Sequence, residues 1–240
     1  NTFTFTVNDG TTDSASSYTM TVDVTAVNDA PTASNNTVTT NEDTDHTFSA
    51  SEFGFTDVDG DSLDHVSIET LPSNGTLLLS GSAVSAGDQI STANISNLVF
   101  RPAANANGAS YDTFTFTVND GTTDSASSYT MTVDVTAVND APTASNNTVT
   151  TNEDTDHTFS ASEFGFTDVD GDSLDHVSIE TLPSNGTLLL SGSAVSAGDQ
   201  ISTANISNLV FRPAANANGA SYDTFTFTVN DGTTDSASSY

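Results

Sequence analysis

The chain consists of one long segment repeated in tandem. Residues 1–129 and 112–240 are identical at every position except the first, where Asn1 corresponds to Asp112. A repeat of about 110 residues can close a hydrophobic core of its own, whereas short solenoid repeats bury a core only by stacking. The sequence therefore predicts a linear array of near-identical domains.

Apolar residues alternate with polar residues within the repeat. Residues 113–118 place Phe114 and Phe116 on one face and threonines on the other, and residues 130–138 repeat this pattern. A period of two is typical of half-buried strands. Five further strands are expected at 36–40, 46–50, 63–69, 75–79 and 97–100. Seven short strands with turn residues between them predict an all-β fold, a seven-stranded Greek-key β-sandwich of immunoglobulin-like type.

The sequence Val-Asn-Asp-Ala-Pro marks the domain boundaries. It occurs at 27–31 and again at 138–142, directly after the last expected strand. Proline cannot donate a hydrogen bond to a continuing sheet, so it ends the strand. We expect residues 1–30 to be the final strands of a preceding repeat and residues 31–141 to be one complete repeat. Residues 142–240 are expected to form a second repeat that lacks its final strand.

The charge of the chain is strongly one-sided. The sequence has 32 Asp and Glu against two Lys and Arg, a formal net charge of -30. Nucleic acids and anionic membranes require clustered basic residues, so neither is expected as a partner. Cysteine is absent, which excludes disulfides and thiolate metal sites. No apolar run reaches the length of a membrane span.

Acidic residues gather in three loops or linkers, at 41–43, 57–61 and 139–140. The Asp-Val-Asp-Gly-Asp run at 57–61 supplies hard oxygen ligands on a tight turn, and such ligands suit Ca²⁺. The run is not an EF-hand, because Gly60 occupies the fourth position and Ile68 the twelfth. The pattern predicts calcium as the cofactor.

These acidic motifs resemble those of cadherin repeats. Residues 138–142 resemble the cadherin linker, and residues 41–43 are similar to the early glutamate motif. Residues 57–59 resemble the Asp-x-Asp motif, and residues 118–121 the Ala-x-Asp-x-Gly motif. The Asp-Arg-Glu motif of animal cadherins has no counterpart. The resemblance implies calcium between successive repeats, with one or two ions at each junction.

Three further segments, at 71–77, 100–102 and 112–116, resemble the cadherin-like tandem repeats of giant bacterial RTX-type adhesins. Carried over to this chain, the first junction would use Asp9, Asn28, Asp29, Glu42, Asp57 and Asp59. The second junction would use Asp120, Asn139, Asp140, Glu153, Asp168 and Asp170. Additional candidate ligands are Asp43, Asp61, Asp154 and Asp172.

No enzymatic site is expected. The histidines, His46 and His65 with their copies, show no metal-binding spacing and are interpreted as strand residues. No nucleophile elbow occurs. A site copied in every repeat would also be an unusual design for an enzyme.

The sequence therefore indicates a structural role. We expect an extender or spacer of a secreted bacterial surface adhesin or matrix fibre, with neighbouring repeats as its partners and calcium as the stiffening agent. One alternative is a module that binds polysaccharide or a like copy on another cell, with Tyr111 and Tyr129 as the main exposed aromatic candidates. Another is a fibre subunit that donates a strand to the next copy.

Overall fold

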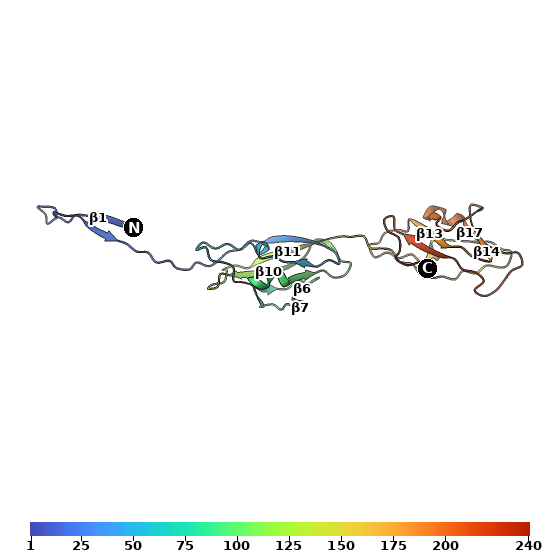
Figure 1. Ribbon diagram of the computed structural model, residues 1–240, viewed down its shortest axis with the longest axis horizontal. Coiled ribbons are helices and arrows are strands. Elements are labelled where there is room, and N and C mark those ends of the chain that lie inside the picture. The colour runs from blue at the N-terminus through green and yellow to red at the C-terminus, as the bar shows by residue number, and fades with distance from the viewer. The chain divides into compact units, whose positions relative to one another are not determined.

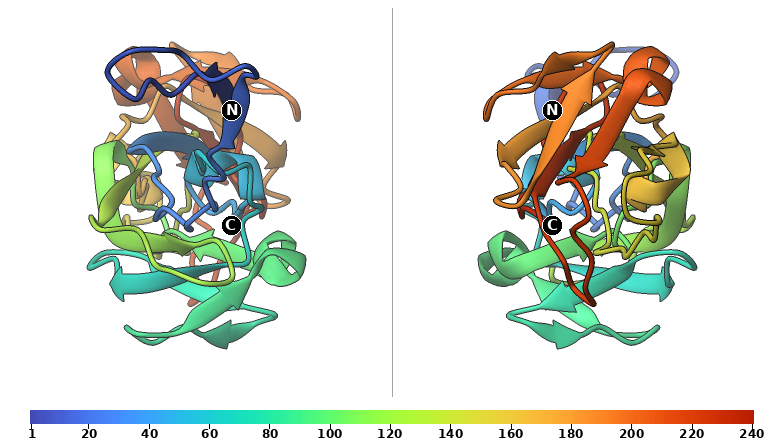
Figure 2. Two further views of the ribbon diagram at one scale, coloured as in Figure 1. Left: turned by 90° about the vertical axis from the view of Figure 1, so that its left-hand side faces the viewer. Right: turned by 90° about the vertical axis from the view of Figure 1, so that its right-hand side faces the viewer.

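The computed structural model describes all residues from 1 to 240. The chain separates into two compact units. Unit 1 contains Asn1–Thr40, Thr44–Pro102 and Ala109–Asp134. Unit 2 contains Asn41–Asp43, Ala103–Gly108 and Val135–Tyr240. Almost every regular element is a strand, and the helical segments are short 3₁₀ helices (Figures 1 and 2).

The complete repeat, residues 31–141, contains two mainly antiparallel sheets. The first has the order β3-β11-β10-β5-β8, with β3 at Asn36–Asn41, β11 at Tyr129–Thr136, β10 at Gly108–Asn119, β5 at His65–Thr70 and β8 at Gln89–Ser91. The second has the order β4-β9-β6-β7, with β4 at His46–Thr47, β9 at Leu98–Arg101, β6 at Thr76–Leu79 and β7 at Ser82–Ala83. The 3₁₀ turns are η1 at Ala50–Phe53 and η2 at Thr92–Asn97.

Phenylalanines fill the space between the sheets. Phe114 and Phe116 of β10 are 1% and 0% exposed. The ring of Phe114 meets Phe48 edge-on at 5.6 Å, and that of Phe116 meets Phe53 at 4.9 Å. Edge-to-face pairs at these distances are a favourable aromatic geometry. The apolar residues whose alternation predicted an all-β sandwich are therefore the residues that fill its core. The predicted fold class is confirmed.

All seven predicted strands are present, and two short strands were not predicted. β7 has two residues and β8 has three, of which only Ile90 is fully buried. A period of two cannot be recognised over so few residues. Strand β10 also begins at Gly108, five residues before the predicted strand.

The second repeat builds a smaller version of the same sandwich. One sheet has the order β12-β17-β14-β15, with β12 at His157–Thr158, β17 at Leu209–Pro213, β14 at Gly186–Leu190 and β15 at Ser193–Ala194. The other has the order β16-β13-β18, with β16 at Gln200–Ser202, β13 at His176–Thr181 and β18 at Thr226–Asn230. The 3₁₀ turns are η3 at Ala161–Phe164 and η4 at Thr203–Asn208.

Identical sequences adopt different structures in the two repeats. Residues 36–41 form β3, whereas residues 147–152, which have the same sequence, form no strand. β3 pairs with β11, and the residue that corresponds to the first residue of β11 is Tyr240, the last of the described residues. A strand needs a hydrogen-bonding neighbour, so the edge segment stays irregular where that neighbour is missing.

The N-terminal segment forms an isolated hairpin. β1 at Thr2–Phe5 pairs with β2 at Tyr18–Thr21. Phe3 is 56% exposed, although its copy Phe114 is 1% exposed in the complete repeat. The chain has no helix long and apolar enough to cross a membrane.

Candidate metal centre

Each Asp-Val-Asp-Gly-Asp loop wraps around its first carboxylate. Asp57 Oδ1 accepts the backbone N–H groups of Asp59 at 2.8 Å and Asp61 at 3.1 Å. Gly60 provides the positive φ of 86° that this turn requires. The three carboxylates of the loop each offer an oxygen within 4.8 Å of the others. Asp168, Asp170 and Asp172 repeat the arrangement.

The linker that precedes each loop is hydrogen-bonded to it. The backbone N–H of Asp29 donates to Asp59 Oδ2, and that of Asp140 to Asp170 Oδ2, both at 2.7 Å. These bonds place the linker aspartate directly beside the loop. In the second of these pairs, the carboxylate of Asp140 also interacts electrostatically with the carboxylates of Asp170 and Asp168.

The linker asparagine holds a further aspartate in each cluster. The amide of Asn28 donates to Asp120 Oδ2 at 3.0 Å, and that of Asn139 donates to Asp231 Oδ2 at 2.9 Å. The hydrogen bond from Asn28, together with backbone N–H groups, holds the pKa of Asp120 below its usual range. Asp120 therefore stays ionised and available as an oxygen ligand.

Glu42 contacts the linker at the end of its own repeat. Glu42 is only 3% exposed. Its carboxylate accepts a hydrogen bond from the backbone N–H of Val138 and another from the side-chain amide of Asn107, the latter at 3.1 Å. The N–H of Val138 is the main cause of its lowered pKa. The neighbouring Asp43 accepts the N–H of Asn105 at 3.0 Å. All five residues belong to unit 2.

We call the two sets linker cluster 1 and linker cluster 2. Linker cluster 1 contains Asn28, Asp29, Asp57, Asp59, Asp61 and Asp120. Linker cluster 2 contains Glu42, Asp43, Asn139, Asp140, Asp168, Asp170, Asp172 and Asp231.

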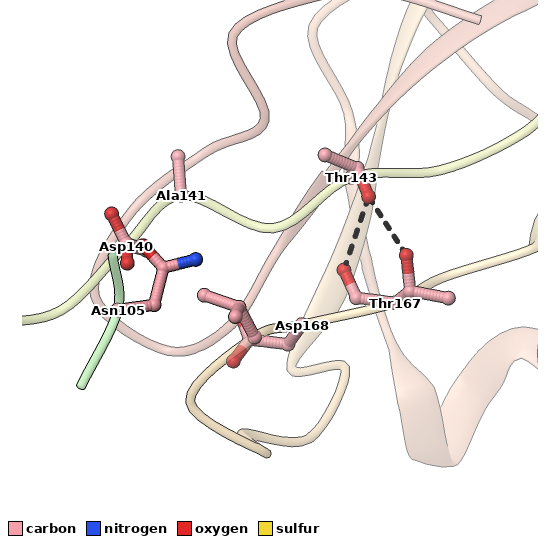
Figure 3. A pocket seen from close by; sticks show the side chains of 7 residues that line it. Asn105, Asp140, Ala141, Thr143, Thr167 and Asp168 are labelled. Carbon is pink, nitrogen blue, oxygen red and sulfur yellow. Dashed lines mark hydrogen bonds between the residues drawn. The ribbon is translucent and has the colours of Figure 1, made fainter. Parts of the chain in front are cut away.

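Linker cluster 2 contains concentrated, partly desolvated negative charge. Burial raises the pKa of Asp140, and so do the charges of Asp170, Asp43, Glu42 and Asp168 in that order. The Oδ2 atoms of Asp140 and Asp168 are inaccessible to solvent and accept no hydrogen bond. Figure 3 shows Asn105 beside Asp140. Both residues line, together with Asp168, an open hollow of about 410 Å³. Buried carboxylate oxygens ordinarily have a donor or a cation as partner.

The structure changes the predicted grouping of three residues. Glu42 was predicted with Asp57 and Asp59, but it lies in linker cluster 2. Asp120 was predicted in the second set, but it contacts Asn28 in linker cluster 1. Asp9 lies in its own hairpin turn, where the hydroxyl and N–H of Thr11 and the N–H of Thr12 lower its pKa to about 2.

The direction of two strands explains the regrouping. At one end of β3 and β11, the N–H of Thr130 donates to Asn35, and at the other end the N–H of Glu42 donates to the carbonyl of Thr136. The two strands are therefore parallel neighbours, and both end where the linker leaves the repeat. Sequence order alone does not reveal this pairing, because the strands are nearly a full repeat apart.

Three other acidic residues, two of them predicted, lie as follows. The carboxylate of Glu153 accepts the Asn218 amide at 2.9 Å and, unlike Glu42, no linker N–H. Its neighbour Asp154 accepts the N–H of Asn216 at 2.8 Å. Asp231, which the sequence analysis missed, is the third copy of Asp9 and Asp120 and could have been found by that repetition.

The remaining residues of interest have packing roles. His46 lies 3.2 Å from Glu52 and His65 lies 2.9 Å from Asp64, each with a half-buried ring. Tyr111 packs edge-on against Phe100, and its hydroxyl donates to the carbonyl of Asn74. Tyr129 packs against Phe116, with the ring centroids 6.0 Å apart. Both Tyr111 and Tyr129 are half-buried.

Comparison with known proteins agrees with the sandwich fold. A family model described as bacterial Ig domain matches residues 28–136 and 139–239. A search of curated proteins found no match.

The solved structures found by comparison are distant. They include two endo-fucoidan hydrolases from glycoside hydrolase family 107, at 16% and 17% identity and a TM-score of 0.28, covering 100% and 98% of this chain. The chain spans 33% and 32% of those chains. The surface layer protein SbsC, domains 1-6, has 14% identity and a TM-score of 0.25 over 92% of this chain and 25% of that chain.

Domains of the matched family are typically non-enzymatic structural modules of surface or extracellular proteins. The match covers most of the chain in two consecutive copies, and each copy contains the sandwich described above. The chain therefore belongs to the bacterial Ig domain family, as a tandem repeat.

Proposed function

We propose that this chain is a spacer of a bacterial surface adhesin in which Ca²⁺, bound in the linker clusters, stiffens the connection between successive repeats. The single observation that supports it most is the pair of buried, unpartnered carboxylate oxygens of Asp140 and Asp168 in linker cluster 2. The domain boundaries near residues 30 and 141 are part of this proposal.

The donor set fits calcium better than other common ions. The cluster offers carboxylate and amide oxygens and no sulfur or imidazole nitrogen. Ca²⁺ takes six to eight oxygen ligands in flexible geometry, whereas Mg²⁺ needs a near-ideal octahedron. Glu42 and the linker come from one repeat and residues 168–172 from the next, so one ion would bind both.

Electrostatic repulsion gives the reason for a cation. Two carboxylates about 4 Å apart repel by roughly 4 kcal/mol at an effective dielectric constant of 20. Several such pairs amount to a large fraction of the roughly 5–15 kcal/mol that stabilises a domain. A divalent cation removes this cost and replaces it with attraction.

Glu42→Gln and Glu153→Gln form a matched test, because the two glutamates have the same local sequence but only Glu42 contacts a linker. We expect millimolar Ca²⁺ to raise the melting temperature of the wild-type chain above its value in chelator. Glu42→Gln should weaken the calcium midpoint about tenfold or more, the loss expected for a charged oxygen ligand. Glu153→Gln should leave that midpoint unchanged.

The readouts are calorimetry and isothermal titration with Ca²⁺, with Mg²⁺ at equal ionic strength as the ion control. An identical melting temperature in calcium and in chelator would exclude the proposal. Equal effects of the two substitutions would place any bound calcium outside linker cluster 2.

A further inference from the structure

Asn-Gly steps are the points of this sequence at which a side-chain amide is most easily lost. They occur at 74–75, 107–108, 185–186 and 218–219. Asparagine is among the thermolabile residues of proteins. In an Asn-Gly step the backbone nitrogen of the glycine can attack the side-chain amide of the asparagine, because glycine has no side chain that hinders the approach. The structure divides these steps into two kinds.

The first kind is held in place by hydrogen bonds. The N–H of Gly75 donates to Asp112 Oδ2 at 2.8 Å, and a Cβ built at Gly75 would lie 2.3 Å from Phe100 Cζ. Gly186 and Asp223 repeat this hydrogen bond at 2.8 Å. The nitrogen that would attack is therefore bound by a carboxylate in a crowded place, and the step resists cyclisation.

The second kind is open. Asn107 is exposed and directly precedes β10, and no atom lies within 4 Å of a Cβ built at Gly108. Gly219, in the copy of this step, has the same free space. The backbone can therefore rearrange here without displacing a neighbour, which closure of a ring onto the glycine nitrogen requires.

The side chain of Asn107 contacts the candidate metal centre. Its amide nitrogen donates to Glu42 Oε2 at 3.1 Å. The other carboxylate oxygen of Glu42 accepts the N–H of Val138, and the charge of Glu42 also acts on Asp140. A change of charge at Asn107 therefore acts directly on linker cluster 2.

We propose that Asn107 is a modification site, at which conversion of the amide to a carboxylate adds negative charge to linker cluster 2. The nitrogen of Gly108 bonds to Cγ of Asn107, the Cγ–Nδ2 bond breaks, and ammonia leaves with the proton of the Gly108 N–H. Water then opens the cyclic imide, and the product is aspartate or isoaspartate, each with one carboxylate. Because the ammonia is lost, the change is one-way.

The new carboxylate reverses the interaction with Glu42. A donor becomes a like charge at hydrogen-bond distance, and Glu42 is only 3% exposed, so the repulsion is weakly screened. With calcium, the same group is an added oxygen ligand, and the affinity of such sites depends on the charge of their ligands. The modified chain therefore depends more strongly on calcium. This consequence rests on the proposed function, whereas the conversion itself does not.

Peptide mapping by mass spectrometry tests the conversion. The two repeats give fragments of identical sequence, so the chain carries Asn185→Gln and Asn218→Gln. The remaining signals then come from Asn107 and Asn74. During incubation at mildly alkaline pH with chelator, Asn107 should convert at least about tenfold faster than Asn74, because the Gly75 N–H must first leave its carboxylate. Equal rates, or an Asn107 that stays intact, overturn the proposal.

Asn107→Asp and Asn218→Asp test the effect on the metal centre. Asn218 donates to Glu153, which is exposed and accepts no linker N–H, so Asn218→Asp is the matched control. In calorimetry with chelator, Asn107→Asp should lower the melting temperature more than the control does. In a calcium titration it should move the midpoint to about tenfold lower calcium, and the control should leave the midpoint unchanged.

Two outcomes contradict the effect on linker cluster 2. One is an Asn107→Asp chain that melts like the control in chelator, and the other is an unchanged midpoint in a parent chain that binds calcium. A parent chain that binds no calcium would exclude the proposed function instead. The mapping rates and the melting temperatures in chelator would still decide whether Asn107 is converted and whether its charge acts on the cluster.

Discussion

Asp112 fastens a loop of the complete repeat through its carboxylate. It is 5% exposed and accepts the backbone N–H groups of Ser73, Asn74 and Gly75. Burial opposes ionisation, but the N–H groups outweigh it and hold the pKa of Asp112 below its usual value. The only difference between the copies falls here, where Asn1 corresponds to Asp112.

Replacing this carboxylate should therefore destabilise the repeat mainly at neutral pH. Asp112→Asn should lower the free energy of unfolding by about 2 kcal/mol, the scale of charge-assisted hydrogen bonds. Because the folded pKa is depressed, this contribution is present above the unfolded pKa of about 3.9 and is lost as pH falls through the folded value.

Urea unfolding at pH 7 and under acid conditions measures the effect. The difference between wild type and Asp112→Asn should shrink as the pH falls below about 4. Asp223→Asn, which removes the same contacts in the second repeat, is the matched variant. A difference that is independent of pH would assign the effect to shape rather than charge.

Gly75 is a second residue on which the packing of this loop depends. A Cβ built at this position would lie 2.3 Å from Phe100 Cζ and 2.8 Å from the carbonyl oxygen of Arg101. Gly75→Ala should cost about 2 kcal/mol or more, because neither a buried ring nor the paired β9 backbone can move freely. Gly219→Ala, with no atom within 4 Å, is the control and should be close to neutral in thermal unfolding.

At the scale of elements, strand formation depends on neighbours as much as on composition. β2 and the first residues of β11 share the sequence Tyr-Thr-Met-Thr, but β2 has one neighbour, β1, and β11 has two. Residues 147–152, a copy of β3, have no paired strand at all. Isolated hairpins are marginally stable in water, so these copies differ in stability although they have the same intrinsic propensity.

Hydrogen exchange should separate the copies. Amides of β11 should exchange about a thousandfold or more slowly than the matching amides of β2, since only the former require unfolding of the repeat. NMR or mass spectrometry of peptides that distinguish the copies measures the ratio. Equal rates in β2 and β11 would show that the hairpin is stable by itself.

At the scale of the whole molecule, the acidic charge is the main property that the solvent can change. A net charge of -30 has only Arg101 and Arg212 to oppose it, and each arginine forms an exposed pair, with Asp45 and Asp156 respectively. Exposed pairs contribute at most about 1 kcal/mol. Repulsion among the remaining carboxylates therefore disfavours the folded chain at low ionic strength.

Raising the salt concentration from about 0.01 to 0.15 M shortens the Debye length from roughly 30 to 8 Å. The melting temperature should rise over this range because repulsion is screened. Calcium at the same ionic strength should raise it further if it binds in the linker clusters, and differential scanning calorimetry with sodium and magnesium controls compares the two effects. A melting temperature that falls with added salt would contradict the repulsion argument.

The sequence alone determined the tandem repeat, the all-β class and the seven main strands, because repetition and a period of two are local properties that can be read residue by residue. It also identified most of the acidic residues of the candidate metal centre. Only the tertiary structure decided how these residues group. The parallel pairing of β3 and β11 brings Glu42 to the linker at Val138, and the Asn28–Asp120 contact joins positions nearly a full repeat apart.

Whether a copied segment forms a strand was likewise determined by the tertiary structure. Residues 36–41 and 147–152 have one sequence and two structures, because hydrogen-bonding partners distant in the chain complete a strand in one repeat and not in the other. Local propensity specifies which residues can form a strand, and the free energy of pairing and burial determines whether they do.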